Sequence, residues 1–149
     1  YLLSTDICYE DILPSFIRKL MGPIDDDGTR PHAMVNLTND SWYGPVEPYI
    51  HLSMATFRSI EHRRWLIRST ATGISAFIDS SGRVVRQSGF ETEEILVEDV
   101  PMITAGPTIY GRIGDLFGWL CAAAAAGGIA WPRLRRRPQA DARDEAAAA

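Results

Sequence analysis

Residues 7–10, with the sequence Ile7-Cys8-Tyr9-Glu10, join the end of a short run to a thiol, an aromatic ring and an acid. The run opens with Tyr1-Leu2-Leu3, and Pro14 follows shortly after the acid. This order predicts a strand that ends at Cys8, with a turn and the start of a helix directly behind it. A thiol at such a junction suits covalent chemistry, because the backbone N–H groups after it can face an oxyanion and a helix N-terminus favours the thiolate. Most free cysteines are small buried hydrophobes, and that interpretation stays open at this point.

A second β-prone run covers residues 33–38 and leads into Asn39-Asp40-Ser41-Trp42-Tyr43-Gly44. Together with the Cys-Tyr-Glu run, it resembles the carbon–nitrogen hydrolase (nitrilase) superfamily, and within it the apolipoprotein N-acyltransferase family. The resemblance extends from about Leu3 to Trp131, with further support from residues 51–64, 72–79 and 110–115. One departure is visible: where the family usually carries Thr-Asn-Thr-Gly, this chain has Thr70-Ala71-Thr72-Gly73. Any role of that amide is therefore in question here.

The pattern of elements predicts an α/β domain with a mixed sheet. Strands over residues 2–7 and 33–38 are separated by helices over 14–20 and 48–63, and a hairpin turn at 80–83 follows, with a last strand over 95–100. The resemblance implies a nitrilase-like αββα sandwich, of which residues 1–110 would be the C-terminal part. Such a sandwich needs nearly twice 149 residues, and the chain opens with Tyr inside a strand. We therefore expect the C-terminal portion of a longer protein.

The end of the chain changes character. Residues 116–131 contain no charged side chain, and an arginine-rich run, residues 133–137, follows at once. Sixteen helical residues span roughly 24 Å, slightly short of a hydrocarbon core. We expect a transmembrane helix within 111–132 and a basic, then Ala-rich, cytoplasmic tail over 133–149, because arginines mark the cytoplasmic side. The Ala- and Gly-rich centre is only weakly apolar, so a buried helix of a soluble domain is the alternative.

The resemblance assigns roles to five residues. Cys8 would be the nucleophile, and the backbone N–H of Tyr9 would face the oxyanion. Glu10 would orient the nucleophile by hydrogen bonding, with an exposed acid at a helix start as the alternative. Trp42 and Tyr43 would line the substrate pocket, unless they only pack the loop. The family's general base and its lysine lie upstream of the Cys motif, so the catalytic set of this chain is incomplete.

Several other polar residues are interpreted as structural. Asn39 and Asp40 are predicted to cap the turn after the second strand. The polar residues of the helix over 48–63 and its end are predicted to form ion pairs or interdomain contacts; they are His51, Glu61, Arg63 and Arg64.

Composition excludes several classes of function. The net charge of −4 gives no reason to expect nucleic-acid binding. Cys8 and Cys121 are far apart and indicate no disulfide framework. The three histidines show no metal-ligand spacing with either thiol, so we predict neither a metal nor another cofactor.

The resemblance implies an N-acyltransferase at the bacterial cytoplasmic (inner) membrane, with its catalytic domain on the outer, periplasmic side. An acyl chain from a phospholipid would pass through a thioester at Cys8 to the N-terminal amine of an apolipoprotein. The chain by itself is expected to be inactive. Two alternatives stay open: a soluble nitrilase-type amidase, and a non-catalytic remnant tethered to a membrane.

Overall fold

The computed structural model describes residues 1–42 and 44–135, with side chains as far as residue 131. Two compact units are present, residues 1–114 and residues 115–149, and each is considered by itself. The first unit contains a five-stranded sheet, and the second contains one long helix.

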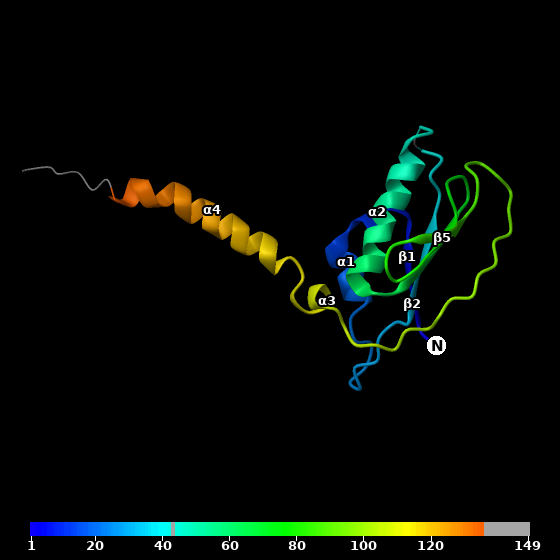
Figure 1. The fold of residues 1–149 in the computed structure, drawn as a ribbon, viewed down its shortest axis with the longest axis horizontal. Coiled ribbons are helices and arrows are strands. Elements are labelled where there is room, and N and C mark those ends of the chain that lie inside the picture. Colours follow the sequence, from blue (N-terminus) through cyan, green and yellow to red (C-terminus); the bar gives the residue numbers. More distant parts are fainter. Residues whose placement is uncertain (43, 136–149) are drawn as a thin grey trace, which may run out of the picture. The chain divides into compact units, whose positions relative to one another are not determined.

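The sheet is mixed, as the sequence predicts, with strand order β1-β2-β3-β4-β5. Figure 1 shows the ribbon, with β1, β2 and β5 labelled. The first three strands are parallel to one another, and the last two continue the sheet antiparallel. The strands are β1 (Leu3–Ile7), β2 (Ala33–Thr38), β3 (Trp65–Thr70), β4 (Ala76–Ile78) and β5 (Val84–Gln87).

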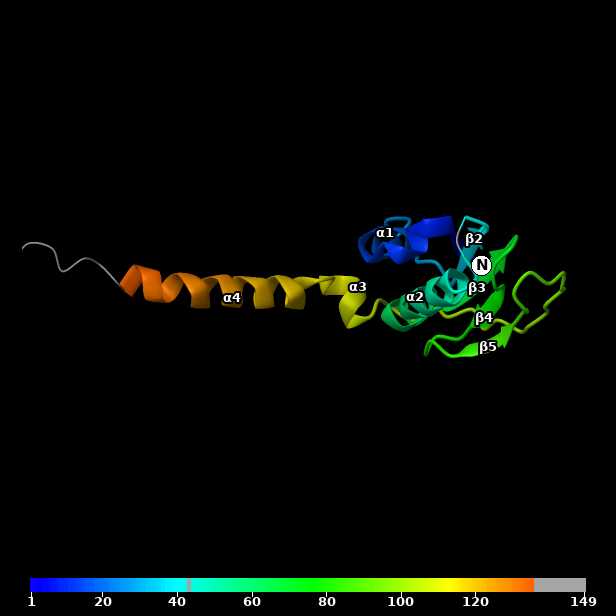
Figure 2. The same ribbon diagram turned by 90° about the horizontal axis from the view of Figure 1, so that it is seen from above.

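Helices connect the parallel strands, because parallel neighbours require a crossover. A short 3-10 helix, η1 (Cys8–Ile12), follows β1 directly and leads into α1 (Pro14–Leu20), which begins with proline at its first position. α2 (Glu47–His62) connects β2 to β3 and ends at Arg63, whose φ of 52° is left-handed. Figure 2 shows α1 and α2 on the same side of the sheet.

The hydrophobic core lies between this pair of helices and the sheet. Its buried side chains alternate along the strands with residues that point away from the helices, as a pleated strand requires. The fully buried members include Ile17, Met34, Ala55, Leu66, Ile74 and Ile78. On the opposite face of the sheet, Leu3, Ile7 and Leu37 are exposed in the part of the chain that the structure describes.

One predicted strand is wrong. Residues 95–100 form no strand in the structure, and Ile95 and Val97 are exposed. An extended run becomes a strand only when a neighbouring strand accepts and donates its backbone hydrogen bonds. Here β5 pairs with β4, and the contact of the segment with β5 is a side-chain one, with Arg86 Nε 3.1 Å from Glu98 Oε2.

Two helices complete the described chain. α3 (Ile109–Ile113) is capped by Thr108, whose hydroxyl accepts the N–H of Gly111 at 2.9 Å. α4 (Leu116–Arg135) forms the second unit and covers the apolar run for which a helix is predicted. Among the described residues, no helix combines the length and the apolar character needed to cross a membrane. The transmembrane helix expected within 111–132 is therefore not found: five alanines and two glycines dilute the centre of α4.

The hairpin between β4 and β5 gives a test of packing at a positive φ. Gly82 has φ 86°, and a Cβ there would lie 2.5 Å from Ile60 Cγ1 on α2. We expect Gly82→Ala to lower the free energy of unfolding by about 2–3 kcal/mol, combining backbone strain and overpacking. Gly28 is the matched control, because its φ is 77° but its Cβ would meet nothing within 4 Å. Gly28→Ala should cost only about 1 kcal/mol. Equal losses in urea unfolding would show that the contact with Ile60 contributes nothing.

Candidate functional site

The candidate site lies where the three parallel strands end. The register aligns Ile7 with Leu37 and Leu37 with Ser69, so the loops after β1, β2 and β3 meet at one edge of the sheet. Ligand sites of open α/β sheets form beyond these carboxyl ends. An open cavity of about 490 Å³ lies here, and its lining residues are Ile7, Cys8, Leu37, Thr38, Asn39, Trp42, Ser69, Thr70 and Ala71. Its volume is in the range of small-molecule sites.

Cys8 occupies the first position after β1 and lines this cavity. Its φ is 53°, in the left-handed region that non-glycine residues rarely adopt. Such a conformation costs on the order of 1–3 kcal/mol and is concentrated at functional sites, where the surrounding structure holds it. The thiol is partly exposed and forms no disulfide. A strained, accessible cysteine at a strand-to-helix turn agrees with the nucleophile predicted from the sequence and is not the small buried hydrophobe.

The two residues after Cys8 support the turn. The Glu10 carboxylate accepts the backbone N–H of Ile7 at 2.7 Å, so it bonds to the residue that precedes the thiol. Tyr9 is half-exposed, and its ring lies 6.0 Å from the ring of His51, centroid to centroid. Glu10 therefore bonds to the backbone of the turn that carries Cys8, which is the kind of contact that an orienting role requires.

The loop after β2 supplies the other wall of the cavity. Trp42 lines the cavity and is 82% exposed. Tyr43, the second predicted pocket residue, lies outside the described residues. The Asn39 carboxamide oxygen accepts the N–H of Ser41 at 3.1 Å and the hydroxyl of Thr72 at 2.8 Å, which confirms its predicted capping role.

A buried polar network lies directly beneath the Cys8 turn. Asp6, Asn36 and Arg68 occupy adjacent register positions on β1, β2 and β3, and each is at most 2% exposed. Asn36 Nδ2 donates to Asp6 Oδ2 at 2.6 Å and to the carbonyl of Cys8 at 3.2 Å. Arg68 Nη1 donates to Asn36 Oδ1 at 2.8 Å. The polar row across the three strands thus reaches the backbone of Cys8.

Two carboxylates bind the Arg68 guanidinium. Arg68 Nη1 lies 2.9 Å from Asp11 Oδ2 in η1, and Nη2 lies 3.0 Å from Asp40 Oδ2 in the loop after β2. All three side chains are nearly inaccessible, so the pairs are weakly screened. Asp40 therefore does not cap an exposed turn as predicted; it is a buried ligand of Arg68. Gly73 makes room for it, since a Cβ there would collide with the Asp40 carboxylate.

His51 bridges the same two carboxylates from α2. Its Nε2 lies 2.8 Å from Asp11 Oδ1, and its Nδ1 lies 3.0 Å from Asp40 Oδ1. Because both ring nitrogens face carboxylate oxygens, both must carry hydrogen, which makes the ring an imidazolium. Burial and the charge of Arg68 would lower the pKa of His51, but the hydrogen bonds that the ring donates to Asp11 and Asp40, with the charge of Asp11, outweigh them and raise the pKa above its ordinary value. The predicted structural ion pair of His51 is confirmed, but its place beneath the nucleophile was not anticipated.

One acid of this polar row, Asp6, has an unusual pKa. Burial raises the pKa of Asp6 to about 6, and the charges of Asp11 and Glu10 act in the same direction, while the Asn36 hydrogen bond opposes them. Asp6 therefore exchanges a proton near neutral pH, two residues before the thiol.

Three potential metal-binding side chains also meet here. Ligand atoms of Asp40, Glu47 and His51 lie within 4.8 Å of one another. These residues would hold a metal ion only if His51 Nδ1 exchanged its contact with Asp40. The sequence spacing gave no sign of this group, because Asp40 and Glu47 reach His51 from the turn and from the first turn of α2.

Of the remaining residues predicted to form ion pairs, Glu61 does so, with Arg58 Nη2 2.9 Å from its Oε1. Arg63 ends α2 in a left-handed conformation. Arg64 is buried and donates to backbone carbonyls; none of the ion pairs among the described residues includes it.

Comparisons with known proteins identify related sequences. The family model described as carbon–nitrogen hydrolase matches residues 2–110. The chain is 45% identical over 117 residues to apolipoprotein N-acyltransferase 2 of Leptospira interrogans, covering 76% of this chain and 19% of that protein. It is 38% identical to apolipoprotein N-acyltransferase of Geobacter metallireducens (80% and 22% covered) and 33% identical to that of Pseudomonas aeruginosa (93% and 26%). The chain thus spans only about a fifth to a quarter of these relatives.

A solved structure shares the fold. A carbon–nitrogen hydrolase superfamily protein from Xanthomonas campestris matches with a TM-score of 0.55 at 17% identity, over 66% of this chain and 40% of that one. At this identity the likeness supports the nitrilase-like α/β fold and no more.

Removing the central cation gives a direct test of the network. Arg68→Met should lower the free energy of unfolding by about 3–5 kcal/mol, because it leaves the buried Asp11 and Asp40 with His51 as their one cationic partner. Arg83→Met is the control: its side chain is 79% exposed, so a loss below about 1 kcal/mol is expected. Urea unfolding followed by circular dichroism measures both. Similar losses in the two variants would contradict a central role for Arg68.

The protonated His51 makes stability depend on pH with a definite sign. Its folded pKa is raised above the unfolded value, so its contribution is fully present below about pH 6.5 and is lost as pH rises through the folded pKa. The free energy of unfolding of the wild-type chain should therefore fall, relative to that of His51→Gln, as pH rises above 7. This range lies above the pKa of Asp6. Unfolding free energies of both proteins at pH 7, 8 and 9 measure it. If the wild type became more stable relative to His51→Gln as pH rises, His51 would not be protonated in the folded chain.

Proposed function

The chain belongs to the carbon–nitrogen hydrolase family, and from this premise we propose that it is the C-terminal part of an apolipoprotein N-acyltransferase. The observation that carries the proposal is Cys8, held at a positive φ on the rim of an open cavity and followed by Tyr9 and Glu10. The shared name of relatives at 33–45% identity supports the choice of acyl transfer.

The proposed reaction has two acyl transfers. The Cys8 thiolate attacks the ester carbonyl of a phospholipid, the ester C–O bond breaks, and the lysophospholipid leaves as an alcohol after taking a proton. The α-amine of the apolipoprotein's N-terminal residue then attacks the thioester. An amide forms, the C–S bond breaks, and the thiol is released. A thioester is reactive enough for this second step, which suits cysteine over serine.

We propose supporting roles for three residues around Cys8. The backbone N–H of Tyr9 is the proposed oxyanion donor, because it is the first amide after the nucleophile, at the start of a 3-10 helix. Glu10 would orient the turn through the N–H of Ile7. The indole of Trp42 would contact the acyl chain or the headgroup, since it lines the cavity and is open to solvent.

The general base is proposed to come from another part of the enzyme. Among the described residues, none forms a hydrogen bond with the Cys8 thiol, and Glu10 is engaged with Ile7. The only lysine is Lys19, on α1. We therefore place the base and the oxyanion-stabilising lysine outside these 149 residues, and expect no acyl transfer by the chain alone.

The cellular setting follows from the substrates. A phospholipid donor and an apolipoprotein acceptor require a membrane, and we propose the outer face of the bacterial cytoplasmic membrane, where exported lipoproteins present their N-terminus. In this proposal residues 1–110 belong to the hydrolase-like domain, and residues 111–132 lead from it to the basic tail over 133–149.

The test is an acyl-enzyme trap in the longer enzyme proposed here. Incubation with radiolabelled phospholipid should give a labelled protein that neutral hydroxylamine cleaves, and Cys8→Ser should abolish the label. Cys121→Ser is the matched control and should retain it, since Cys121 lies on α4. Label that persists in Cys8→Ser and disappears in Cys121→Ser would overturn the assignment. Release of free fatty acid or ammonia from an amide, with no label transfer to a lipopeptide amine, would favour an amidase.

A further inference from the structure

The edge of the sheet opposite Cys8 gathers basic side chains. Leu2, His32 and Arg64 each precede a strand, and the register of the three parallel strands sets them side by side. Arg30 comes from the loop before β2 and donates through Nη1 to the carbonyl of Met21 at 3.0 Å. This edge is formed by strand starts, whereas the Cys8 cavity is formed by strand ends.

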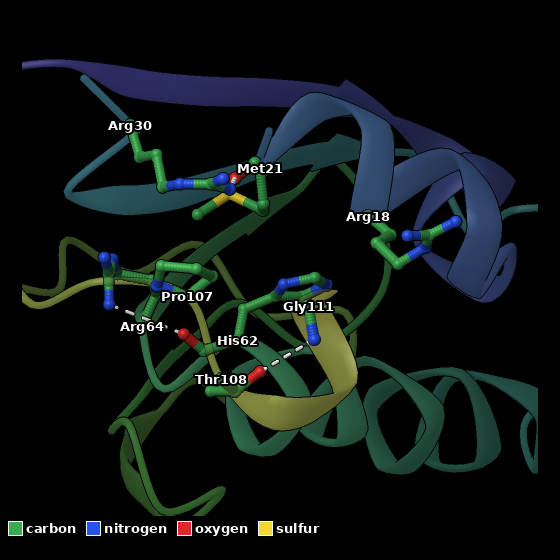
Figure 3. Close-up of a pocket in the computed structure, with 8 residues that line it drawn as sticks. All are labelled: Arg18, Met21, Arg30, His62, Arg64, Pro107, Thr108 and Gly111. Atoms are coloured by element: carbon green, nitrogen blue, oxygen red, sulfur yellow. Dashed lines mark hydrogen bonds between the residues drawn. The ribbon is translucent and has the colours of Figure 1, made fainter. Parts of the chain in front are cut away.

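A cavity of about 270 Å³ opens at this edge. Five of its lining residues carry side chains that are able to donate hydrogen bonds: Thr29, Arg30, His32, Arg64 and Thr104. A smaller cavity of about 10 Å³ adjoins it through Arg30 and Arg64 and adds Arg18 and His62 (Figure 3). No Asp or Glu is among the described residues that line either cavity.

The tautomer of His32 is fixed by its backbone contact. Its Nδ1 accepts the N–H of Leu2 at 2.9 Å, so in the neutral ring Nε2 carries the hydrogen. His32 therefore adds an N–H donor to this edge.

The guanidinium groups have no carboxylate partner. Arg64 is 97% buried, and the carbonyls of Pro31, His62, Arg63 and Ala105 accept its N–H groups. None of the ion pairs among the described residues includes Arg18, Arg30 or Arg64. Backbone carbonyls accept the N–H groups of Arg64 and one N–H of Arg30, but no carboxylate in an ion pair among the described residues balances the charge of these arginines, so an anion would be stabilised at this edge.

The positive charge of these arginines affects the pKa values of neighbouring groups. Burial lowers the pKa of His62 to about 4, and the charges of Arg58, Arg64, Arg18 and Arg30 all act in the same direction. Burial and Arg30 together lower the pKa of Arg64. The buried His62 Nε2 has no hydrogen-bond partner among the described residues, on a side chain that lines the smaller cavity.

We propose that this edge is a phosphate-binding site, in which Arg30 contacts the oxygens of a phosphate group and His32 with the threonine hydroxyls completes its shell. Arg64 contributes its positive charge and the one Nη2 hydrogen that no carbonyl of the described residues accepts. A guanidinium, a ring N–H and two hydroxyls, with a second positive charge beside them, match a tetrahedral anion with several acceptors better than a planar carboxylate. The cavity is large enough for a phosphate monoester or diester. Because it lies at the other end of the strands from Cys8, the site is separate from the proposed acyl-transfer site and does not depend on it.

Binding of inorganic phosphate to the 149-residue chain is the first test. ¹H–¹⁵N spectra recorded during a titration should show saturable shifts at Thr29, His32, Ala105 and Gly106, with Thr38 and Asn39 unmoved. Arg30→Gln should weaken binding at least tenfold. Arg83→Gln, which removes the same charge from an exposed position, should leave binding within twofold. Arg30→Lys keeps the charge but loses the planar set of N–H donors of the guanidinium, and should also weaken binding.

A second arm separates the sources of the phosphate. Vesicles of phosphatidylglycerol should retain the chain, and Arg30→Gln but not Arg83→Gln should release it, if the group comes from a lipid headgroup. Binding of inorganic phosphate without Arg30-dependent vesicle binding would identify a soluble phosphate compound. Absence of saturable binding in both arms, or equal losses in the Arg30→Gln and Arg83→Gln variants, would overturn the site. If Arg30→Gln unfolds, His32→Gln replaces it, with a loss of binding of about threefold or more expected.

Discussion

The buried Arg68 guanidinium is the contact on which the arrangement of this domain depends. It joins β3 to β2 through Asn36, to η1 through Asp11 and to the loop after β2 through Asp40. A buried ion pair adds little net stability compared with apolar side chains of similar size. Removal of one partner is costly, however, because the other charge is left unpaired in a low-dielectric interior. The elements that surround Cys8 are therefore coupled: the turn that carries the thiol cannot move without disturbing a charge that has no access to water.

The strands, the helices and the nucleophile could be predicted because they depend on local order in the sequence. β-prone runs end at Cys8 and at Asn39, and Pro14 marks a helix start. The network could not be predicted, because it depends on register. Asp6, Asn36 and Arg68 are separated by 30 and 32 residues and become neighbours only when the three strands pair. The approach of His51 from α2 likewise depends on how the helix packs on the sheet.

The last strand was predicted wrongly, and the predicted membrane span is not found among the described residues. The sequence pattern of residues 95–100 is typical of a segment that is able to pair as a strand. Pairing also requires a neighbouring strand that offers its backbone groups, and the contact with β5 is one between side chains, Arg86 and Glu98. The apolar stretch of α4 is a different case. It carries no charge, but its central alanines and glycines make it only weakly apolar, as its composition already indicates. The strand thus requires a neighbour that a single window of sequence does not hold, whereas the weak hydropathy of α4 is a property of the sequence itself.

The left-handed conformation of Cys8 restricts which chemistry the fold is able to adopt at this position. A β-branched side chain is strongly disfavoured at φ 53°, because its second γ-substituent meets the backbone. Threonine is thereby excluded as an alternative nucleophile on steric grounds, before its reactivity is considered. Glycine and asparagine would fit the backbone but bring no nucleophile. Among aliphatic side chains with a hydroxyl or thiol, only the unbranched ones, serine and cysteine, fit this backbone. The conformation of the turn therefore restricts which nucleophiles are able to evolve at this position.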